Sequence, residues 1–131
     1  MVDSVGREPA IRLVMMPRDT NSMGSIFGGH ILSLIDLAAG EHARSIAPKL
    51  FVTKVMREVE FIQPVFVGDL VSFYTSTVRT GRTSVTIKVE VESRRRTTRD
   101  GDPIGPAVPV TCAEVVMVAV DKELKPTPIA E

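Results

Sequence analysis

The sequence has one cysteine, no tryptophan and no long apolar run. A single cysteine, Cys112, excludes an internal disulfide and favours a reducing compartment. The two histidines, His30 and His42, stand apart from any second cysteine, so the spacing of a structural zinc site is missing and we expect no bound metal. No segment approaches the roughly 20 apolar residues of a membrane span, and the first residues contain no apolar leader. We therefore expect a cytoplasmic protein without a membrane partner.

The sequence also lacks an excess of either charge. Its 16 Lys and Arg residues balance 16 Asp and Glu residues. Proteins that bind nucleic-acid backbones usually carry a marked basic excess, so we expect no nucleic-acid partner. With 131 residues, 44% of them hydrophobic, the chain is long enough for one core and short for two domains. We expect a single domain over residues 1–131, with flexible tails at about 1–9 and 125–131.

Alternating apolar and polar residues predict β-strands in the second half of the chain. The clearest strand has one apolar face, formed by Val85, Ile87, Val89 and Val91. Its other face is expected to meet water and carries Thr86, Lys88, Glu90 and Glu92. A turn at Thr80-Gly81-Arg82 predicts that this strand is the second half of a hairpin over about 71–95.

Two further strands are expected, at about 52–62 and about 108–120. The second of these is apolar on both faces, which predicts that a helix or another subunit covers each face. The segment before it, residues 99–109, is rich in Gly, Pro and Asp and is expected to be a flexible loop.

One stretch predicts a long helix, from Gly28-Gly29 to about Ile46, just before Pro48. Helical spacing gathers apolar residues on one side: Ile31, Leu34, Ile35, Ala38, Ala39, His42 and Ile46. His42 is therefore interpreted as a core or interface residue. The opposite side is small or polar and carries Gly29, Ser33, Asp36, Gly40 and Arg44. One helix and about five mostly antiparallel strands predict an α+β fold in which the sheet curls around the helix.

The segment from Asp19 to His30 combines polar side chains with three glycines directly before this helix. A helix start presents free backbone N–H groups, so it can bind an anion or a polarised carbonyl oxygen. A simple turn with a helix cap is the alternative. Farther along, Asp36 interrupts an apolar run, with no basic neighbour before Arg44. Burial of an unpaired carboxylate is costly, so Asp36 is either a functional acid or a residue on the solvated edge of the helix.

Two basic features are open to two interpretations. His30 lies in the first helical turn, where it either contacts a substrate or simply packs. The run Arg94-Arg95-Arg96, with Arg99, is either a solvated strand end or a phosphate-binding patch.

The most specific motif of the sequence is MPRDTNSMGSIFGG at residues 16–29, followed by Asp36. Supporting motifs are FIQPVFVGD at 61–69, TSV at 83–85 and VAVD at 118–121. With these motifs the sequence resembles the hotdog-fold acyl-CoA thioesterases, in particular the bacterial short-chain acyl-CoA hydrolases and the cytosolic acyl-CoA thioesterases of animals. The resemblance extends from Leu13 to about Pro126.

The resemblance implies a hotdog fold, in which one central helix is wrapped by an antiparallel sheet, and a homo-oligomer. Family members form dimers whose sheets join, commonly three dimers to a hexamer, with active sites at subunit boundaries. It implies that Asp36 is a general base or nucleophile. Asn21, supplied by the partner subunit, would position water or the thioester, and the backbone at Gly28 and Gly29 would receive the thioester oxygen. No cofactor is expected, because CoA belongs to the substrate.

The same resemblance suggests substrate-binding residues. Phe27 and His30 adjoin the proposed oxygen site, and the CoA nucleotide is expected near Arg82, Thr83 and Ser84, with the arginine run as a further phosphate partner. Relatives often carry tryptophan or an aliphatic residue at the position of His30, so this residue bears on chain-length preference.

Two other function classes compete with hydrolysis of acyl-CoA. One is a non-catalytic acyl-CoA sensor or carrier, but the presence of both Asn21 and Asp36 favours catalysis. The other is a hotdog hydratase or dehydratase, which relies on an acid together with a catalytic histidine. Neither His30 nor His42 has a convincing position for that role.

Overall fold

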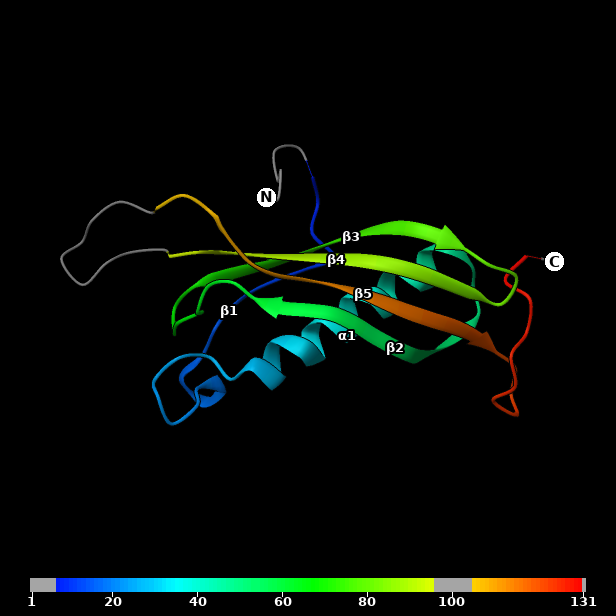
Figure 1. Cartoon of the computed structure of the whole chain (residues 1–131), viewed down its shortest axis with the longest axis horizontal. Coiled ribbons are helices and arrows are strands. Elements are labelled where there is room, and N and C mark those ends of the chain that lie inside the picture. Colours follow the sequence, from blue (N-terminus) through cyan, green and yellow to red (C-terminus); the bar gives the residue numbers. More distant parts are fainter. Residues whose placement is uncertain (1–6, 96–104, 131) are drawn as a thin grey trace.

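The computed structural model describes residues 7–95 and 105–130. Along the chain it contains β1 (Ile11–Val14), the short 3-10 helix η1 (Pro17–Asp19), α1 (Gly28–Ile46), β2 (Leu50–Phe61), β3 (Leu70–Thr80), β4 (Ser84–Arg94) and β5 (Val108–Val120). The strands form one antiparallel sheet in the order β1-β3-β4-β5-β2. Figure 1 shows this sheet lying over α1. The α+β expectation of one long helix and about five strands is confirmed.

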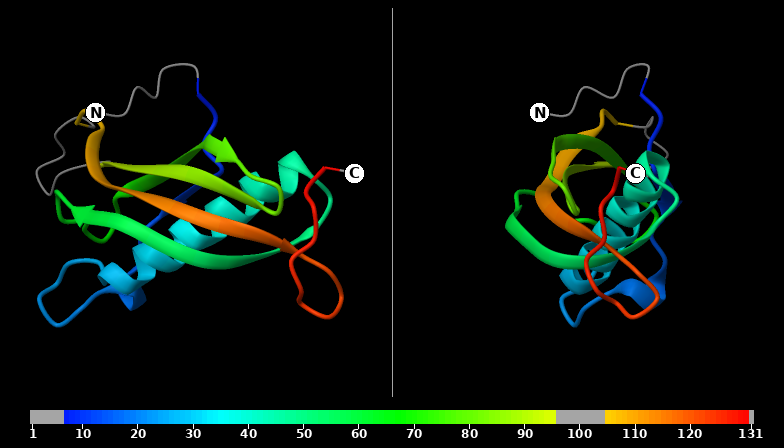
Figure 2. Two further views of the ribbon diagram at one scale, coloured as in Figure 1. Left: turned by 45° about the vertical axis from the view of Figure 1, so that its right-hand side comes forward. Right: turned by 90° about the vertical axis from the view of Figure 1, so that its right-hand side faces the viewer.

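The core lies between α1 and the concave face of the sheet, which wraps around the helix when the molecule is viewed from its end (Figure 2). The apolar face predicted for β4 is buried there: Val85, Ile87, Val89 and Val91. The helix turns a slightly different side inward from the one expected. Gly40 and Ala43 are buried, while Ile46 is 38% exposed. The small and polar side predicted for the helix is therefore buried at Gly40 but accessible at its other positions.

The outer face of β4 is drier than expected, because Thr86 and Glu92 are buried. The Tyr74 hydroxyl donates a 3.1 Å hydrogen bond to Glu92, and it accepts one of 3.0 Å from Arg12. Arg7 lies over the Tyr74 ring, 4.8 Å from its centre. The N-terminal segment therefore covers this part of the sheet and supplies the partners that a buried carboxylate needs.

The segment after β5 packs against the domain, in contrast to the flexible tail expected from about residue 125. Thr127 N–H donates to the Ala119 carbonyl and Ile129 N–H donates to the Arg82 carbonyl, both at 2.9 Å. Ile129 is buried in the core. Residues 1–6 and 131 lie outside the described residues, as do Arg96, Arg99 and most of the loop expected at 99–109.

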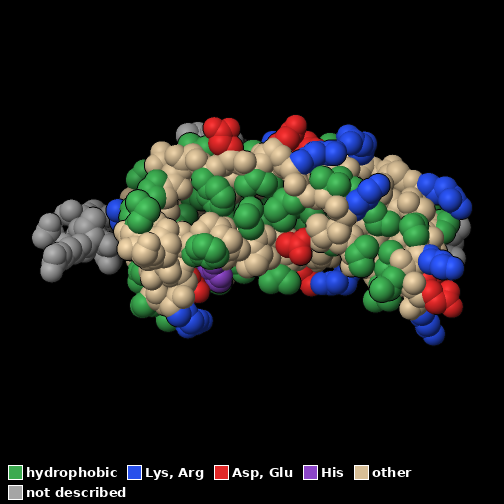
Figure 3. All heavy atoms as spheres, turned by 60° about the horizontal axis from the view of Figure 1, so that its bottom comes forward, with side chains coloured by type: hydrophobic (Ala, Val, Ile, Leu, Met, Phe, Trp, Pro, Cys, Tyr) green, Lys and Arg blue, Asp and Glu red, His purple; other side chains and the backbone are tan. Residues whose placement is uncertain are grey.

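Strand β2 is an edge of the sheet, and it exposes apolar side chains at Leu50, Val52 and Phe61. Figure 3 shows hydrophobic side chains spread over this side of the molecule. On the neighbouring β5, α1 covers the inward residues such as Val115, whereas the outward Val116 is only half-buried. An exposed edge strand with apolar side chains is a surface that a second chain can extend.

Candidate active site

The start of α1 leaves backbone donors free. Ile26 N–H donates to the Val65 carbonyl at 2.7 Å and Phe27 N–H to the Asp19 carbonyl at 2.7 Å, which holds the loop before the helix. The His30 N–H donates to the Phe27 carbonyl at 3.0 Å. Within residues 7–95 and 105–130, neither Gly28 N–H nor Gly29 N–H has a hydrogen-bond acceptor. These two groups are available to an oxygen of a bound molecule.

A larger residue at the second of these positions would require the Phe27 ring to move. A Cβ atom on Gly29 would lie 2.5 Å from Cε2 of the Phe27 ring. On Gly28 a Cβ would meet Cζ of Phe61 at 3.6 Å, an ordinary contact. The Phe27 ring is 57% exposed, so it lies beside the helix start at the surface.

Asp36 is half-buried in the middle of α1 and faces β2. Its Oδ1 accepts a 2.5 Å hydrogen bond from the hydroxyl of Thr53, whose oxygen also lies 3.5 Å from Sδ of Met117. Arg44, the basic residue that follows on the helix, pairs with Glu41 at 2.9 Å. The described part of the chain places no cation in contact with Asp36, so a hydroxyl orients its carboxylate and leaves Oδ2 without a partner.

Thr53 was not identified from the sequence. Its register partner is Met117, whose side chain lies in the core, so Thr53 points towards the helix from β2. A hydroxyl between Phe51 and Met56, which pack against the core from β2, was the available signal. It could be recognised only once the register of β2 against the helix was known.

The helix geometry brings the free N–H groups and the acid to one side. At about 100° per residue, the directions of Gly29 and Asp36 differ by only about 20°, and seven residues rise about 10 Å. Helical side chains lean towards the helix start, which shortens this gap for the Asp36 carboxylate. A small group bound along this side of α1 can therefore face both the N–H groups and the acid.

Two pockets flank the helix start. The first, here called the Phe61 pocket, has a volume of about 340 Å³ and is lined mainly by Gly28, Ile31, Phe61, Ile62, Pro64 and Val65. The second, here called the Asp19 pocket, has a volume of about 350 Å³ and is lined by Arg18, Asp19, Thr20, Phe27, Gly29 and His30. The first is mainly apolar, whereas the lining of the second is polar and apolar in about equal parts.

The Asn21 side chain forms its hydrogen bonds within its own loop. Its side-chain amide donates to Ser25 Oγ at 3.0 Å, and its Oδ1 accepts from the N–H groups of Met23 at 2.8 Å and Ser25 at 3.3 Å. None of these bonds reaches α1. The structure of one protomer thus does not bring Asn21 to Asp36, and its supply by a partner subunit stays a prediction.

The two histidines have different surroundings. His30 lines the Asp19 pocket, where its Nε2 is buried without a hydrogen bond and lies 3.6 Å from Oδ2 of Asp19. His42 links α1 to β3, because its two ring nitrogens lie 2.9 Å and 2.7 Å from the hydroxyls of Thr75 and Thr77. Burial lowers the pKa of His42 below its ordinary 6.5. His42 is thus half-buried and joins the helix to the sheet outside the core cluster, and its role at an interface stays a prediction.

The residues expected to bind CoA lie at the other end of the molecule. Arg82 and Thr83 lie in the turn between β3 and β4, and Ser84 begins β4. Ala119 N–H donates to the Thr83 carbonyl at 2.8 Å. In Figure 1 this turn lies near the end of α1, and the 19-residue helix separates it from Gly28 by about 28 Å. Within one protomer the turn does not adjoin the helix start.

Arg95, which belongs to the arginine run, also lies far from Arg82. Arg95 follows the far end of β4, about 35 Å away along the strand. There its Nε lies 3.4 Å from Oδ1 of Asp69 and its guanidinium lies 4.5 Å from the centre of the Phe66 ring. Arg82 and Arg95 of one chain are too far apart to bind the same phosphate.

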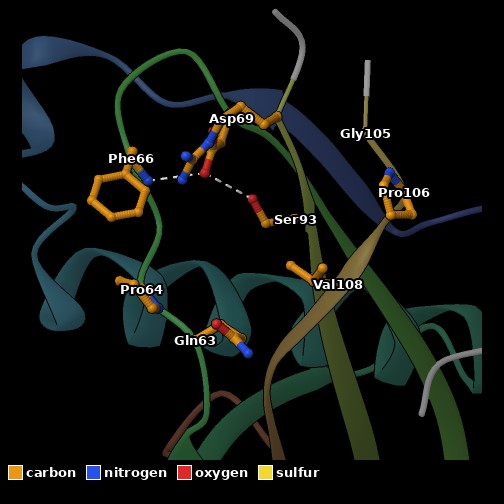
Figure 4. A pocket seen from close by; sticks show the side chains of 9 residues that line it. Gln63, Pro64, Phe66, Asp69, Ser93, Gly105, Pro106 and Val108 are labelled. Carbon is orange, nitrogen blue, oxygen red and sulfur yellow. Dashed lines mark hydrogen bonds and ion pairs between the residues drawn. The ribbon is translucent and has the colours of Figure 1, made fainter. Parts of the chain in front are cut away.

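Asp69 forms the floor of a third pocket of about 370 Å³, shown in Figure 4. Its Oδ2 accepts hydrogen bonds of 3.0 Å from both the Phe66 N–H and the Ser93 hydroxyl. Gly68, with φ of +90°, provides the backbone turn that aims this carboxylate inward. The Gly68-Asp69 pair thus ties the segment before β3 to the end of β4 and has a structural role.

Comparisons with known proteins support one family. A sequence profile described as "Thioesterase superfamily" matches residues 23–99. The chain belongs to the thioesterase superfamily. A relative named acyl-CoA thioester hydrolase YciA, from Escherichia coli, is 40% identical over 88% of this chain and 86% of its own length. The relative of that name from Salmonella typhimurium is 38% identical over 93% and 90%.

Solved structures place this thioesterase-superfamily chain in the hotdog fold. Cj0915, described as a hexameric hotdog fold thioesterase of Campylobacter jejuni, has a TM-score of 0.87 and 43% identity and covers 95% of this chain and 91% of its own. HI0827, described as a hexameric broad specificity acyl-coenzyme A thioesterase, has a TM-score of 0.84 and 36% identity and covers 100% of this chain and 89% of its own.

Among the described residues of this superfamily member, no three His, Cys, Asp or Glu side chains lie close enough to hold a metal ion. None of its described helices is long and apolar enough to cross a membrane.

Proposed function

We propose that this protein hydrolyses acyl-CoA thioesters to a free carboxylic acid and CoA. The observation that carries the proposal is the alignment, on one side of α1, of two free N–H groups and a carboxylate without a cationic partner. The relatives named acyl-CoA thioester hydrolases and acyl-CoA thioesterases support the substrate class.

The free N–H groups match the charge that develops during the reaction. Attack on a thioester turns its carbonyl oxygen into an oxyanion, and a preorganised N–H donor to that oxygen contributes roughly 10²–10³ in rate. Gly28 and Gly29 provide two such donors. A side chain at position 29 would push against the Phe27 ring, which lies 2.5 Å from where its Cβ atom would be.

Asp36 supplies the attacking group in one of two ways. As a general base, its free Oδ2 takes a proton from a water molecule that attacks the carbonyl carbon. As a nucleophile, it attacks the carbonyl carbon itself, expels the CoA thiolate and forms an anhydride that water then opens. In both routes the Thr53 hydroxyl holds Oδ1 and thereby orients the other oxygen.

A homo-oligomer would complete the site. The open edge of β2 allows the sheets of two protomers to join, and its apolar side chains would be covered in the process. We expect the partner subunit to supply Asn21, and Arg82, Thr83 and Ser84 of a neighbouring protomer to hold the CoA nucleotide. The hexameric assemblies of Cj0915 and HI0827 support a dimer that trimerises.

The experiment that tests this function is a panel of acyl-CoA substrates followed by release of free thiol. We expect release with at least one chain length at enzyme concentrations far below that of the substrate. A protein that binds acyl-CoA without releasing thiol from any member of the panel would be a sensor or carrier instead.

A single turnover in water labelled with oxygen-18 tests the anhydride route. Label in the Asp36 carboxylate requires this route, with water opening the anhydride at the carboxyl carbon of Asp36. Label in the released acid alone excludes that opening and is expected when water attacks the thioester directly.

A further inference from the structure

The two pockets beside the helix start differ in the groups that they offer to a ligand. In the Phe61 pocket, Ile31 and Val65 are buried walls, and Phe61 and Ile62 form an apolar rim. In the Asp19 pocket, Arg18, Asp19 and His30 bring charged or hydrogen-bonding atoms. His30 is partly exposed and lines this pocket, so its ring can contact a ligand there, while its Nε2 atom is buried 3.6 Å from Oδ2 of Asp19.

Viewed along the axis of α1, the direction of Asp36 lies between the directions of the two pockets. Viewed down α1, Gly28 and Ile31 of the Phe61 pocket are turned from Asp36 by about 80° and 140° to one side. Gly29 and His30 of the Asp19 pocket are turned by about 20° and 120° to the other side. A carbonyl carbon in front of Asp36 therefore has a pocket on each side, one for each of its two substituents.

The two substituents of an acyl-CoA thioester differ in polarity, as the two pockets do. The acyl chain is apolar and gains free energy when it leaves water for an apolar cavity. The pantetheine arm on the sulfur carries amide groups, which are costly to bury without hydrogen-bond partners. The Phe61 pocket satisfies the first requirement, and the Asp19 pocket satisfies the second.

We propose that the acyl chain enters the Phe61 pocket and that the pantetheine arm crosses the Asp19 pocket, so that Phe61 determines acyl-chain selectivity and His30 binds the arm. This inference rests on the proposed function and adds the direction in which the substrate lies. It assigns to His30 a role in CoA binding that is independent of chain length. It also agrees with the lining of the two pockets, which is mainly apolar beside Gly28 and more polar beside Gly29.

The test compares kcat/KM for straight-chain acyl-CoA substrates from acetyl to decanoyl in four proteins. In the wild type we expect kcat/KM to rise by up to roughly fourfold per methylene until the pocket is full, the factor for moving one CH2 group out of water. Phe61→Ala should flatten this rise, whereas Phe61→Leu should keep most of it. His30→Ala should raise KM by a similar factor for every chain length.

Phe66→Ala is the matched control. Phe66 is an aromatic residue of comparable exposure, 36% against 46% for Phe61, and it lines the third pocket. We expect its chain-length profile to match the wild type, with circular dichroism and native mass confirming that each variant folds and assembles.

The outcomes separate the two proposals. A uniform effect of Phe61→Ala across chain lengths, or a changed chain-length profile in His30→Ala, would overturn the proposed direction while thiol release still supports hydrolysis. Absence of thiol release from every substrate in the wild type would overturn the proposed function itself, and the direction with it.

Discussion

The hydroxyl of Thr53 donates a hydrogen bond to Oδ1 of Asp36, which joins the middle of α1 to the edge strand β2. This bond fixes a carboxylate that otherwise has no charged partner within the described residues. Because this bond engages Oδ1 only, Oδ2 of Asp36 stays available to a molecule bound beside the helix. The strand that forms the open edge of the sheet therefore also positions the proposed catalytic acid.

Thr53→Val should lower kcat by about 10- to 100-fold, because a hydrogen bond to a charged group is worth about 1.5–3 kcal/mol. Thr53→Ser keeps the hydroxyl and should retain most of the activity. Steady-state kinetics with one good acyl-CoA substrate measures both. A loss in Thr53→Ser without a loss in Thr53→Val would show that the methyl group of Thr53, rather than its hydroxyl, matters.

Asp36→Asn should reduce thiol release by about 10²–10⁴-fold, the usual contribution of a positioned general base. The amide has nearly the same size and can still accept a bond from Thr53, so the fold and assembly should persist. Native mass spectrometry checks the assembly. Undiminished hydrolysis in this variant would remove Asp36 from the mechanism.

Mixing two inactive variants tests whether Asn21 acts across a subunit boundary. If Asn21→Ala and Asp36→Asn chains are unfolded together and refolded, half of the dimers are mixed, and each has one intact site. About a quarter of wild-type activity should return with random pairing of the protomers. The separate variants refolded alone serve as controls. No recovery in a mixture shown by mass to contain mixed dimers would place both residues in the same chain.

Gly29→Ala should lower kcat by up to roughly 10²–10³-fold, because the new methyl group would displace Phe27 and the proposed oxyanion site with it. Gly40→Ala is the control on the same helix. A Cβ at Gly40 meets only ordinary contacts of 3.8 Å with Arg44 and Met117, so activity should be kept. Similar losses in both variants would indicate a general effect on the helix.

The pKa of His42 makes stability depend on pH. Burial lowers its pKa in the folded protein below 6.5, so the unfolded chain binds a proton first as the pH falls. The stability that neutral His42 contributes is complete above about pH 6.5 and is lost as the pH falls towards the folded-state pKa.

His42→Gln removes this titration while keeping a group that can bond to Thr75 or Thr77. Melting temperatures measured from pH 8 to pH 5 should fall less steeply in the variant than in the wild type. Parallel curves for the two proteins would contradict the assignment.

Periodic patterns in the sequence predicted the elements that bury a long, regular face. The alternation from Val85 to Val91 and the helical spacing from Ile31 to Ala39 both correspond to core residues. Strand β1 was not specified, because its four residues are too few to show a period. The burial of Glu92 depends on Tyr74 and Arg12, which are distant in sequence and meet only in the folded sheet.

The candidate site was predictable in part for the same reason. Gly28, Gly29 and Asp36 share one helix, so their spacing alone places them on neighbouring faces. Thr53 depends on the register of β2, and the separation of Arg82 from Arg95 depends on both lying at opposite ends of β4. Such relationships between elements are not encoded in any local pattern.

The anchoring of Ile129 beside Arg82 affects how the chain can be handled. Because the last described residues complete the core and support the turn between β3 and β4, trimming the carboxyl end by only a few residues would loosen that turn. An affinity tag is therefore better attached beyond a short linker than in place of these residues.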